Sequence, residues 1–543
     1  MKKLLYFALS VVATSAQLAD EVLLRKWSLQ LPTIEIEGNK FFNSETGEQF
    51  FMKGIAYQQQ VDQGSELYDG TPYVDPLADP HICLRDLPYL VELGINTIRV
   101  YHIDPSSSHD TCMKAFSDAG IYVLIDLAEP EISIVRNNPS WDVKVWSRYR
   151  DVVDAMHFYN NVLGFFAGNE VTNDKYNTDA SPFVKAAIRD VKSYMQQKGY
   201  RNIPVGYSTN DDAETRINLS KYFVCGENSA DFYGINMYEW CGYSTYGTSG
   251  YKERTEEFTD FPVPVFFSEF GCNLVRPRPF TEVAALFSKK MSSVWSGGLV
   301  YMYFEEENQY GVVKINKNNE VEKLPDFDNL KKAYRKATPK GVNLSDQAVS
   351  RKSINVRKLD CPEKSHNNNW LASDILPPTP NDEKCSCLDE ILPCLALPSN
   401  DDQDHYKTLF NYVCGEVDCT DIKTDGTLGK YGKFSDCSVN QKLSLQLSKL
   451  YYKLKLEDHI CPTNPKYVRF NSAIITRKDT CESILKEISQ GTAKTKKEPI
   501  NEIVTSVPAE DGMISSTANT LSGAKLLVIT VLNTLVVLLI AYY

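Results

Sequence analysis

The chain has 543 residues, which suits one large barrel with a smaller module, or about three domains of ordinary size. Its 70 acidic residues exceed its 58 lysines and arginines, and the net charge of −12 argues against a nucleic-acid partner, because a phosphate backbone requires a basic face. A hydrophobic fraction of 43% excludes a chain that is disordered throughout.

The first residues have the form of a secretory signal peptide. Two lysines precede an apolar run over residues 4–13, which is too short to span a bilayer. Small residues follow the run, and we place the cleavage site after Ala16. We therefore expect residues 1–16 to be removed from a secreted mature chain.

Residues 17–340 alternate between short apolar runs and amphipathic segments. The runs are rich in Val, Ile, Phe and Tyr, as in parallel strands buried on both faces. Eight such runs predict an α/β fold, a (β/α)8 TIM barrel, with a doubly wound open sheet as the alternative. No glycine-rich phosphate loop follows the first run, which disfavours the open sheet. The expected strands are Lys53–Gln58, Thr97–Ile103, Tyr122–Leu127, Val162–Glu170, Ile203–Thr209, Phe232–Trp240, Val263–Gly271 and Gly298–Glu305, and clear helical segments are Arg85–Leu93, Cys112–Ala119, Val143–Phe158 and Pro182–Lys198.

Beyond the barrel the sequence predicts a linker, a small disulfide-rich module and a stalk. Residues 341–380 are polar and contain proline, and we expect this linker to pack on the barrel. Residues 381–488 hold eight of the fourteen cysteines and predict a compact module. Residues 489–515 are rich in Ser, Thr and Lys and contain no aromatic residue, which is typical of a solvated stalk.

The last eighteen residues, 526–543, form an uncharged apolar run. A stop-transfer helix is usually followed by Lys or Arg, so a transmembrane tail is the weaker interpretation. Small residues around Ser515, a spacer and an apolar tail are the signal for a GPI anchor, and residues 516–543 would then be removed. We predict attachment at Ser515, with Ser516, Asp511 and Asn519 as alternatives, on the extracellular face of the plasma membrane or in the cell wall.

Cysteine usage and two glycosylation motifs agree with secretion. The number of cysteines is even, but spacing alone does not choose their pairing. Asn218 and Asn343 each begin an Asn-X-Ser motif and are predicted glycosylation sites. The seven histidines form no metal-binding HExxH motif, and disulfides explain the closely spaced cysteines better than a metal does, so no metal or cofactor is expected.

Two of the predicted strands end in a glutamate directly after an apolar run. The fourth ends in Asn169 and Glu170, and the seventh contains Glu269. The active site of a (β/α)8 barrel lies at the carboxyl ends of its strands, where a carboxylate is costly unless it is paired or functional. Two glutamates that face each other there are the groups that cleave glycosidic bonds. An ordinary ion pair is the alternative for either one alone.

These two motifs resemble the signatures of the fungal β-1,3-glucanosyltransferases of glycoside hydrolase family 72. The segments Lys53–Gln58, Asn96–Tyr101, Asn236–Gly242 and Gly298–Phe304 match that family as well. The resemblance implies a retaining transferase that cleaves β-1,3-glucan internally and joins the new reducing end to the non-reducing end of another chain. Donor and acceptor are then both β-1,3-glucan, without a nucleotide sugar. An endo-β-1,3-glucanase and a non-catalytic wall-binding protein remain as alternatives.

The resemblance also implies roles for individual residues. Glu170 becomes the acid/base, whose pKa we expect to be raised, and Glu269 the nucleophile, which should stay ionised. Asn169 is expected to bind the 2-hydroxyl of the donor sugar, and Tyr238 to hold Glu269 by a phenol–carboxylate hydrogen bond. Asp126, at the end of the third strand, supports the site or forms a structural ion pair.

Four further residues match substrate-binding positions of the family. Tyr101 and Tyr301 match aromatic residues on the donor side, with packing in the barrel core as the alternative. Asp211 and Arg216 match polar residues on the acceptor side, and the alternative is a surface salt bridge between the two.

The second module resembles the cysteine-rich carbohydrate-binding module of family 43. This leaves open whether it binds glucan or only braces the barrel. The resemblance implies the disulfides Cys83–Cys112, Cys225–Cys361, Cys241–Cys272, Cys385–Cys437, Cys387–Cys481, Cys394–Cys461 and Cys414–Cys419.

Overall fold

The computed structural model describes residues 31–60, 73–347, 359–397, 403–457, 459–463 and 466–472, together with residues 481, 484 and 486. The expected signal peptide, stalk, Ser515 attachment site and GPI signal lie outside the described residues. Within the described ranges, no helix combines the length and apolar character needed to cross a membrane.

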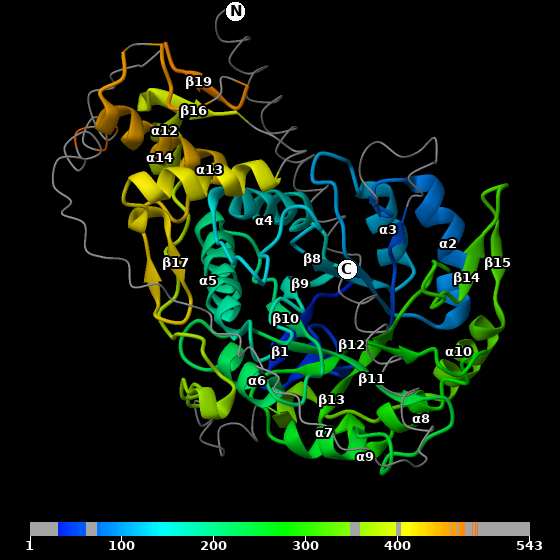
Figure 1. Ribbon diagram of the computed structural model, residues 1–543. Coiled ribbons are helices and arrows are strands. Elements are labelled where there is room, and N and C mark those ends of the chain that lie inside the picture. Colours follow the sequence, from blue (N-terminus) through cyan, green and yellow to red (C-terminus); the bar gives the residue numbers. More distant parts are fainter. Residues whose placement is uncertain are drawn as a thin grey trace, which may run out of the picture.

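Eight strands close into a barrel, each parallel to its neighbours, which confirms the predicted (β/α)8 fold. In Figure 1 the helices form a ring around these strands. The strands are β4 (Met52–Ala56), β7 (Thr97–Val100), β8 (Tyr122–Asp126), β9 (Val162–Asn169), β10 (Val205–Thr209), β11 (Tyr233–Cys241), β12 (Val265–Cys272) and β13 (Trp295–Val300). The helices are α2 (Pro80–Leu93), α3 (Asp110–Asp118), α4 (Val143–Met156), α5 (Ser181–Lys198), α6 (Arg216–Val224), α7 (Tyr251–Glu257), α8 (Glu282–Leu286), α9 (Lys289–Ser292) and α10 (Pro325–Lys336).

The eighth strand lies earlier in the sequence than expected. It spans Trp295–Val300, whereas the apolar run predicted residues 298–305. Beyond Val300 the chain leaves the barrel wall, and Tyr301 follows directly on β13. The aromatic residues of this run therefore belong in part to the mouth of the barrel.

A small antiparallel sheet at the beginning of the described chain covers the amino-terminal end of the barrel. It consists of β1 (Ile34–Glu37), β2 (Lys40–Asn43) and β3 (Gln49–Phe50), strands too short for the sequence pattern to predict. The ring of Phe41 packs 6.3 Å from that of Phe232 and 6.1 Å from that of Phe266. The floor of the barrel is therefore apolar and closed to water.

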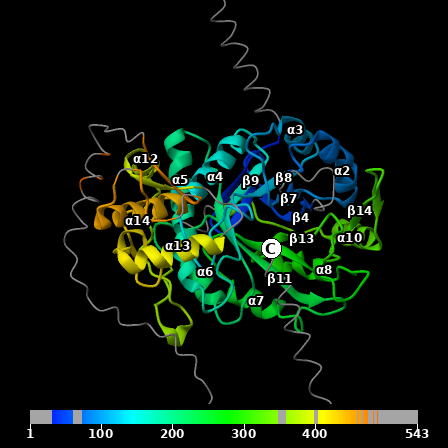
Figure 2. The same ribbon diagram turned by 45° about the horizontal axis from the view of Figure 1, so that its top comes forward.

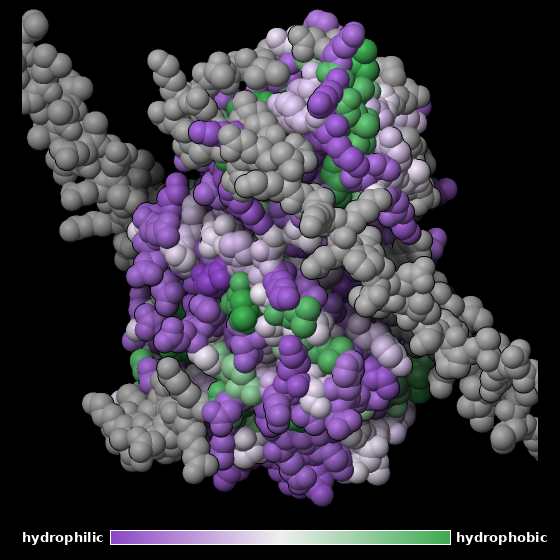
Figure 3. Space-filling model, turned by 60° about the vertical axis from the view of Figure 1, so that its left-hand side comes forward, coloured by the Kyte–Doolittle hydropathy of each residue, from purple (hydrophilic) through white to green (hydrophobic). Residues whose placement is uncertain are grey.

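The C-terminal module is mostly helical and has its own buried clusters. Its elements are α12 (Asp382–Ile391), β16 (Cys394–Ala396), α13 (Gln403–Glu416), β17 (Thr424–Asp425), β18 (Lys430–Tyr431), α14 (Val439–Leu454) and β19 (Val468–Phe470). Figures 1 and 2 both place it beside α4 and α5. On the face that Figure 3 shows, polar side chains predominate and apolar ones gather in a strip on the module.

The remaining elements are short and lie around the barrel. They are β5 (Gln59–Gln60), β6 (Tyr73–Val74), β14 (Val313–Ile315), β15 (Val321–Lys323) and the 3-10 turns η1 (Thr178–Ala180), η2 (His366–Asn368) and η3 (Thr420–Ile422).

Seven disulfides join all fourteen cysteines, in the same pairs that the resemblance implies. Cys225–Cys361 links positions 136 residues apart and fastens the segment after the barrel to the end of α6. In that segment Trp370 is fully buried, and the Tyr222 hydroxyl donates to the Ser373 carbonyl at 2.6 Å. The chain between barrel and module is thus packed along much of its described length.

Candidate active site

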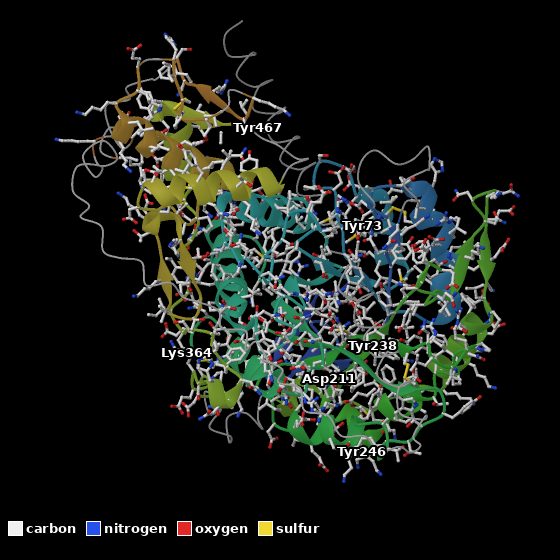
Figure 4. All side chains as sticks on the ribbon, viewed as in Figure 1. Tyr73, Asp211, Tyr238, Tyr246, Lys364 and Tyr467 are labelled. Carbon is white, nitrogen blue, oxygen red and sulfur yellow. A yellow bond between two sulfur atoms is a disulfide. The ribbon has the colours of Figure 1, made fainter. Side chains whose placement is uncertain are left out.

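Glu170 and Glu269 lie at the carboxyl ends of two strands of the barrel. Glu269 is part of β12 and only 8% exposed, while Glu170 directly follows β9 and is half-buried. Each therefore lies at the mouth of the barrel, the end at which the active sites of (β/α)8 barrels are found. In Figure 4 Tyr238 lies over the middle of the barrel, between Tyr73 and Asp211.

Three donors surround the carboxylate of Glu269. The Tyr101 hydroxyl donates to Oε1 at 2.8 Å, and the Tyr238 hydroxyl to Oε2 at 2.9 Å. Arg99 Nη1 lies 3.4 Å from Oε1. Hydrogen bonds to both oxygens fix the side chain and favour its charged form. Tyr238 thus lies as the resemblance implies, and Tyr101 makes a bond to the same carboxylate beyond its expected contact with substrate.

Opposing effects act on the pKa of Glu269. Burial raises it from the usual 4.5 to about 7 against the pull of Arg99, and the neighbouring Glu170 adds to the rise. The Tyr101 and Tyr238 hydroxyls lower it. The sequence expects Glu269 to stay ionised, whereas the structure raises the pKa of this carboxyl, because the barrel encloses it.

Arg99 on β7 is the fully buried cation beneath this site. Its Nε and Nη2 donate to the two oxygens of Asp126 at 2.9 and 2.8 Å, and Nη2 also donates to Asn169 Oδ1 at 3.1 Å. The guanidinium lies 4.3 Å from the ring centroid of Phe166 and 4.4 Å from that of Tyr101. Asp126 therefore forms an ion pair that neutralises and orients the cation on which the active-site side chains converge.

The amide of Asn169 has a fixed orientation. Arg99 has only donors, so the atom of Asn169 that faces it is the oxygen. Asn236 Nδ2 donates to the same oxygen at 3.2 Å and to Glu170 Oε1 at 2.8 Å. The nitrogen of Asn169 is then left to donate to a ligand, as expected of a residue that binds a sugar hydroxyl.

An aromatic cluster continues from Tyr238 along the mouth. Tyr310 packs edge to face against Tyr238 at 5.9 Å and against Tyr301 at 5.4 Å between ring centroids. Tyr301 is half-buried. Partly exposed tyrosines of this kind offer the apolar ring faces and hydroxyl groups that suit a sugar chain.

Asp211 and Arg216 pair with each other, which is the alternative arrangement predicted from the sequence. Arg216 Nη1 donates to Asp211 Oδ1 at 3.0 Å, but the side chains are only 15% and 8% exposed, so the pair is not at the surface. Arg254 and Glu257 on α7 extend the network. Burial raises the pKa of Asp211 to about 7, with Glu239 adding to the rise and Arg216 opposing it. The acceptor role of the pair stays a prediction.

One group of side chains has the composition of a metal site but not its chemistry. Within the described ranges, Cys385, Asp436 and Cys437 bring potential ligand atoms within 4.8 Å of one another. The two sulfurs are bonded to each other in a disulfide and are not available as thiolate ligands.

Sequence reasoning missed Arg99, Asn236 and Tyr310. Arg99 and Asn236 stand inside segments that match the family, next to residues that received a role. A charged or amide side chain within a buried strand was the available signal, because such a group requires partners inside the barrel.

The chain matches known proteins over most of its length. A family model described as "Glucanosyltransferase" matches residues 24–338, and one described as "X8 domain" matches residues 392–468. The 1,3-beta-glucanosyltransferase GAS2 of Saccharomyces cerevisiae is 61% identical over 462 residues, covering 84% of this chain and 83% of the relative. The 1,3-beta-glucanosyltransferase PGA5 of Candida albicans is 50% identical, covering 80% and 70%.

Solved structures of a similar protein superpose on the fold. The apo structure of a glutamate-to-glutamine mutant of Saccharomyces cerevisiae Gas2p has a TM-score of 0.80 and 59% identity, covering 86% of this chain and 98% of that one. A complex of mutant Gas2p with laminaritetraose and laminaripentaose has a TM-score of 0.78 and 59% identity, covering 84% and 99%.

The raised pKa of Glu269 predicts a pH-dependent effect of Glu269→Gln on stability. A folded pKa of about 7 above an ordinary 4.5 means that ionisation destabilises the fold as the pH rises between these values. The neutral amide escapes this cost, so the variant should gain up to about 3 kcal/mol of unfolding free energy, relative to wild type, between pH 4 and pH 8. Denaturant unfolding across this range measures the difference. Glu253→Gln, an exposed change on α7, is the matched control, and a gain from Glu269→Gln that does not grow with pH contradicts the prediction.

Proposed function

The chain belongs to the glucanosyltransferase family, and we propose that it elongates β-1,3-glucan as a retaining transferase, with Glu269 as nucleophile and Glu170 as acid/base. The observation that carries these assignments is the difference between the two carboxyl groups. Glu269 is enclosed and held at both oxygens by donors, whereas Glu170 is half-buried and accepts from Asn236. A nucleophile requires a fixed, charged oxygen, and an acid/base requires access to the oxygen that leaves and the one that enters.

In the first step Glu269 attacks C1 of a donor sugar while Glu170 protonates the departing glycosidic oxygen. The bond between C1 and that oxygen breaks, and C1 becomes joined to Glu269. The glutamate pair must carry one proton, and it must lie on Glu170. Arg99 and the Tyr101 and Tyr238 hydroxyls oppose the rise that burial causes in the pKa of Glu269 and so favour its ionised form. Asn169 Nδ2 faces the 2-hydroxyl of the donor sugar.

In the second step the acceptor replaces the departed chain. Glu170, now ionised, takes the proton of the acceptor's non-reducing-end hydroxyl, and that oxygen attacks C1 and releases Glu269. The configuration at C1 inverts in each of the two steps, so the β-linkage is retained. The net reaction exchanges one β-1,3 bond for another, and the energy of the cleaved bond is kept without a nucleotide sugar.

Substrate class and cellular location follow from the relatives and the disulfides. Gas2p is known in complex with laminari-oligosaccharides, and β-1,3-glucan is accordingly both donor and acceptor for this chain. The protein is extracellular, where seven disulfides persist.

We further propose glycosylation at Asn218 and Asn343. We also propose the division of the chain into barrel (17–340), linker (341–380) and module (381–488), and the X8 match lies within the module.

Glutamine at either catalytic position tests the assignment. Glu170→Gln and Glu269→Gln are nearly isosteric, but neither amide supplies the acid proton or attacks C1, so each variant should lose at least about 10³-fold in transfer. Products from a reduced, labelled laminari-oligosaccharide are separated by chain length, and wild type should give oligomers longer than the substrate. Transfer by the Glu269→Gln protein that approaches the wild-type rate would overturn the role of Glu269.

Asp211→Ala and Arg216→Ala should raise the ratio of hydrolysis to transfer. A well-oriented acceptor hydroxyl has a very high effective concentration, about 10⁵ M or more, and loses it when the groups that orient it are removed. Donor cleavage should fall less than transfer does. Product analysis at rising acceptor concentration gives the ratio, with Asp118→Ala on α3 as a salt-bridge control outside the mouth. Ratios equal to wild type in both variants would leave the pair as a structural network alone.

We also propose that a GPI anchor at Ser515 replaces residues 516–543. The small residues around Ser515, the spacer and the apolar run over residues 526–543 motivate this, because a segment of this kind is removed when the anchor is attached. Phosphatidylinositol-specific phospholipase should release the protein from membranes, and mass spectrometry of the mature chain should end near Ser515. A peptide from residues 526–543 in the mature protein contradicts the anchor.

A further inference from the structure

The backbone of Glu170 has an unusual conformation. Its φ is +47°, in the left-handed region, which is strained for a residue that carries a side chain. The strain is sustained only if the surroundings hold the peptide groups on both sides. The amide N–H donates to the Ser208 carbonyl on β10 at 2.9 Å, so the residue is anchored on its amino-terminal side by the neighbouring strand.

On the carboxyl-terminal side the anchor is Arg136. Its Nη2 donates to the carbonyl of Glu170 at 2.7 Å. Arg136 lies on the loop between β8 and α4, residues 127–142, and is half-buried. It does not pair with the side chain of Glu170 but with its backbone, and the direction in which that side chain points depends on this peptide group.

The loop that carries Arg136 is clamped between the barrel and the module. On the barrel side, Trp141 is buried and its indole N–H donates to Asp190 on α5 at 2.7 Å. Asp142 caps α4 by accepting from the amides of residues 144 and 145. These contacts fix the end of the loop nearest to the module.

On the module side, three hydrogen bonds reach the same few residues. Lys442 Nζ on α14 donates to Ser140 Oγ at 3.2 Å, and Thr424 Oγ1 on β17 donates to the Pro139 carbonyl at 3.4 Å. The amide of Val143 donates to the Asp436 carbonyl at 2.9 Å. Lys442 is a buried cation whose pKa is lowered by burial, against the pull of Asp142 and Asp436, so its contacts are costly to leave unmade.

We propose that Arg136 is a positioning residue for the acid/base Glu170, and that the docked module supports catalysis by fixing the loop from which Arg136 reaches it. The inference rests on the proposed role of Glu170. Without the bond from Arg136 the peptide after Glu170 relaxes toward an ordinary conformation and carries the carboxyl group away from the glycosidic oxygen. Acid assistance is then lost, while Glu269 and the groups that donate hydrogen bonds to it stay in place.

The test compares two donors that differ only in their need for an acid. A laminari-oligosaccharide requires protonation of the leaving sugar, whereas the corresponding 2,4-dinitrophenyl β-glycoside has a leaving group that departs unassisted. Arg136→Gln should lower kcat/KM on the oligosaccharide by about tenfold to a hundredfold, the cost of a displaced catalytic group. The burst of dinitrophenolate that reports attack by Glu269 should fall far less. Arg136→Lys retains a charged donor and should recover part of the loss.

Arg201 supplies the matched control. It is also an arginine that donates to backbone carbonyls, those of Tyr159 and Val162, but these lie at or just before the start of β9, whereas Glu170 follows its end. Arg201→Gln should affect both donors in equal proportion. If Arg136→Gln does the same, the inference is overturned. Glu170→Gln is measured in parallel. If it shows no dependence on the leaving group, the acid role itself fails, and the inference with it.

The part played by the module is tested with Lys442→Met, which keeps the length of the side chain and removes its bond to Ser140. We expect a loss on the oligosaccharide that is smaller than that of Arg136→Gln and again exceeds the loss on the dinitrophenyl glycoside. An equal loss on both donors, or none, overturns the link between the module and Glu170.

Discussion

The mouth of the barrel depends on one buried cation. Arg99 satisfies Asp126 at two oxygens, reaches Asn169 and Glu269, and lies between the rings of Phe166 and Tyr101. A guanidinium cannot lose its charge under ordinary conditions, so its anionic partners are required, and its planar fork dictates where they stand. Asp126 pairs with this charge within the barrel, and Nη1 of the same guanidinium lies 3.4 Å from the carboxylate of Glu269. The orientation of the amide of Asn169 follows from the same fork.

Beneath that cation the barrel is apolar, and this creates the competition that sets the properties of the site. The floor formed around Phe41, Phe232 and Phe266 excludes water, so a carboxylate above it loses solvation and its pKa rises. Arg99 and two phenols oppose that rise without cancelling it. In its proposed role as nucleophile, Glu269 attacks in the ionised form, which Arg99 and the two phenols favour. A carboxylate that water stabilises less also attacks C1 more readily.

The barrel and its two glutamates could be predicted from the sequence. Contacts between distant strands, and strands of only a few residues, could not, because neither leaves a periodic pattern in the sequence. Strands buried on both faces leave continuous apolar runs, so the barrel and the glutamates at the ends of β9 and β12 were visible. The phenol–carboxylate bond of Tyr238 was implied by the resemblance, whereas the bond of Tyr101 to the same carboxylate depends on how two distant strands come together. The predicted eighth strand lies too late in the sequence, because the aromatic run from which it was predicted continues past β13 into the mouth of the barrel. The sheet that contains Phe41 was missed because strands of two to four residues carry too little periodicity.

The placement of the module on the barrel depends on contacts between residues even farther apart in the sequence, and the disulfides are an example. Spacing leaves the pairing open. In the structure the Cys225–Cys361 bridge, the bonds donated by Lys442 and Thr424, and the bond that the Asp436 carbonyl accepts hold the module against the start of α4 and the loop before it. A cross-link over 136 residues restricts the unfolded chain and, in the folded one, limits how far the segment before the module departs from the barrel. The module therefore does not have to bind a sugar in order to matter for the reaction. The module packs against the loop that carries Arg136, and Arg136 holds the backbone carbonyl of Glu170, while Asn236 holds the side chain of Glu170 from within the barrel.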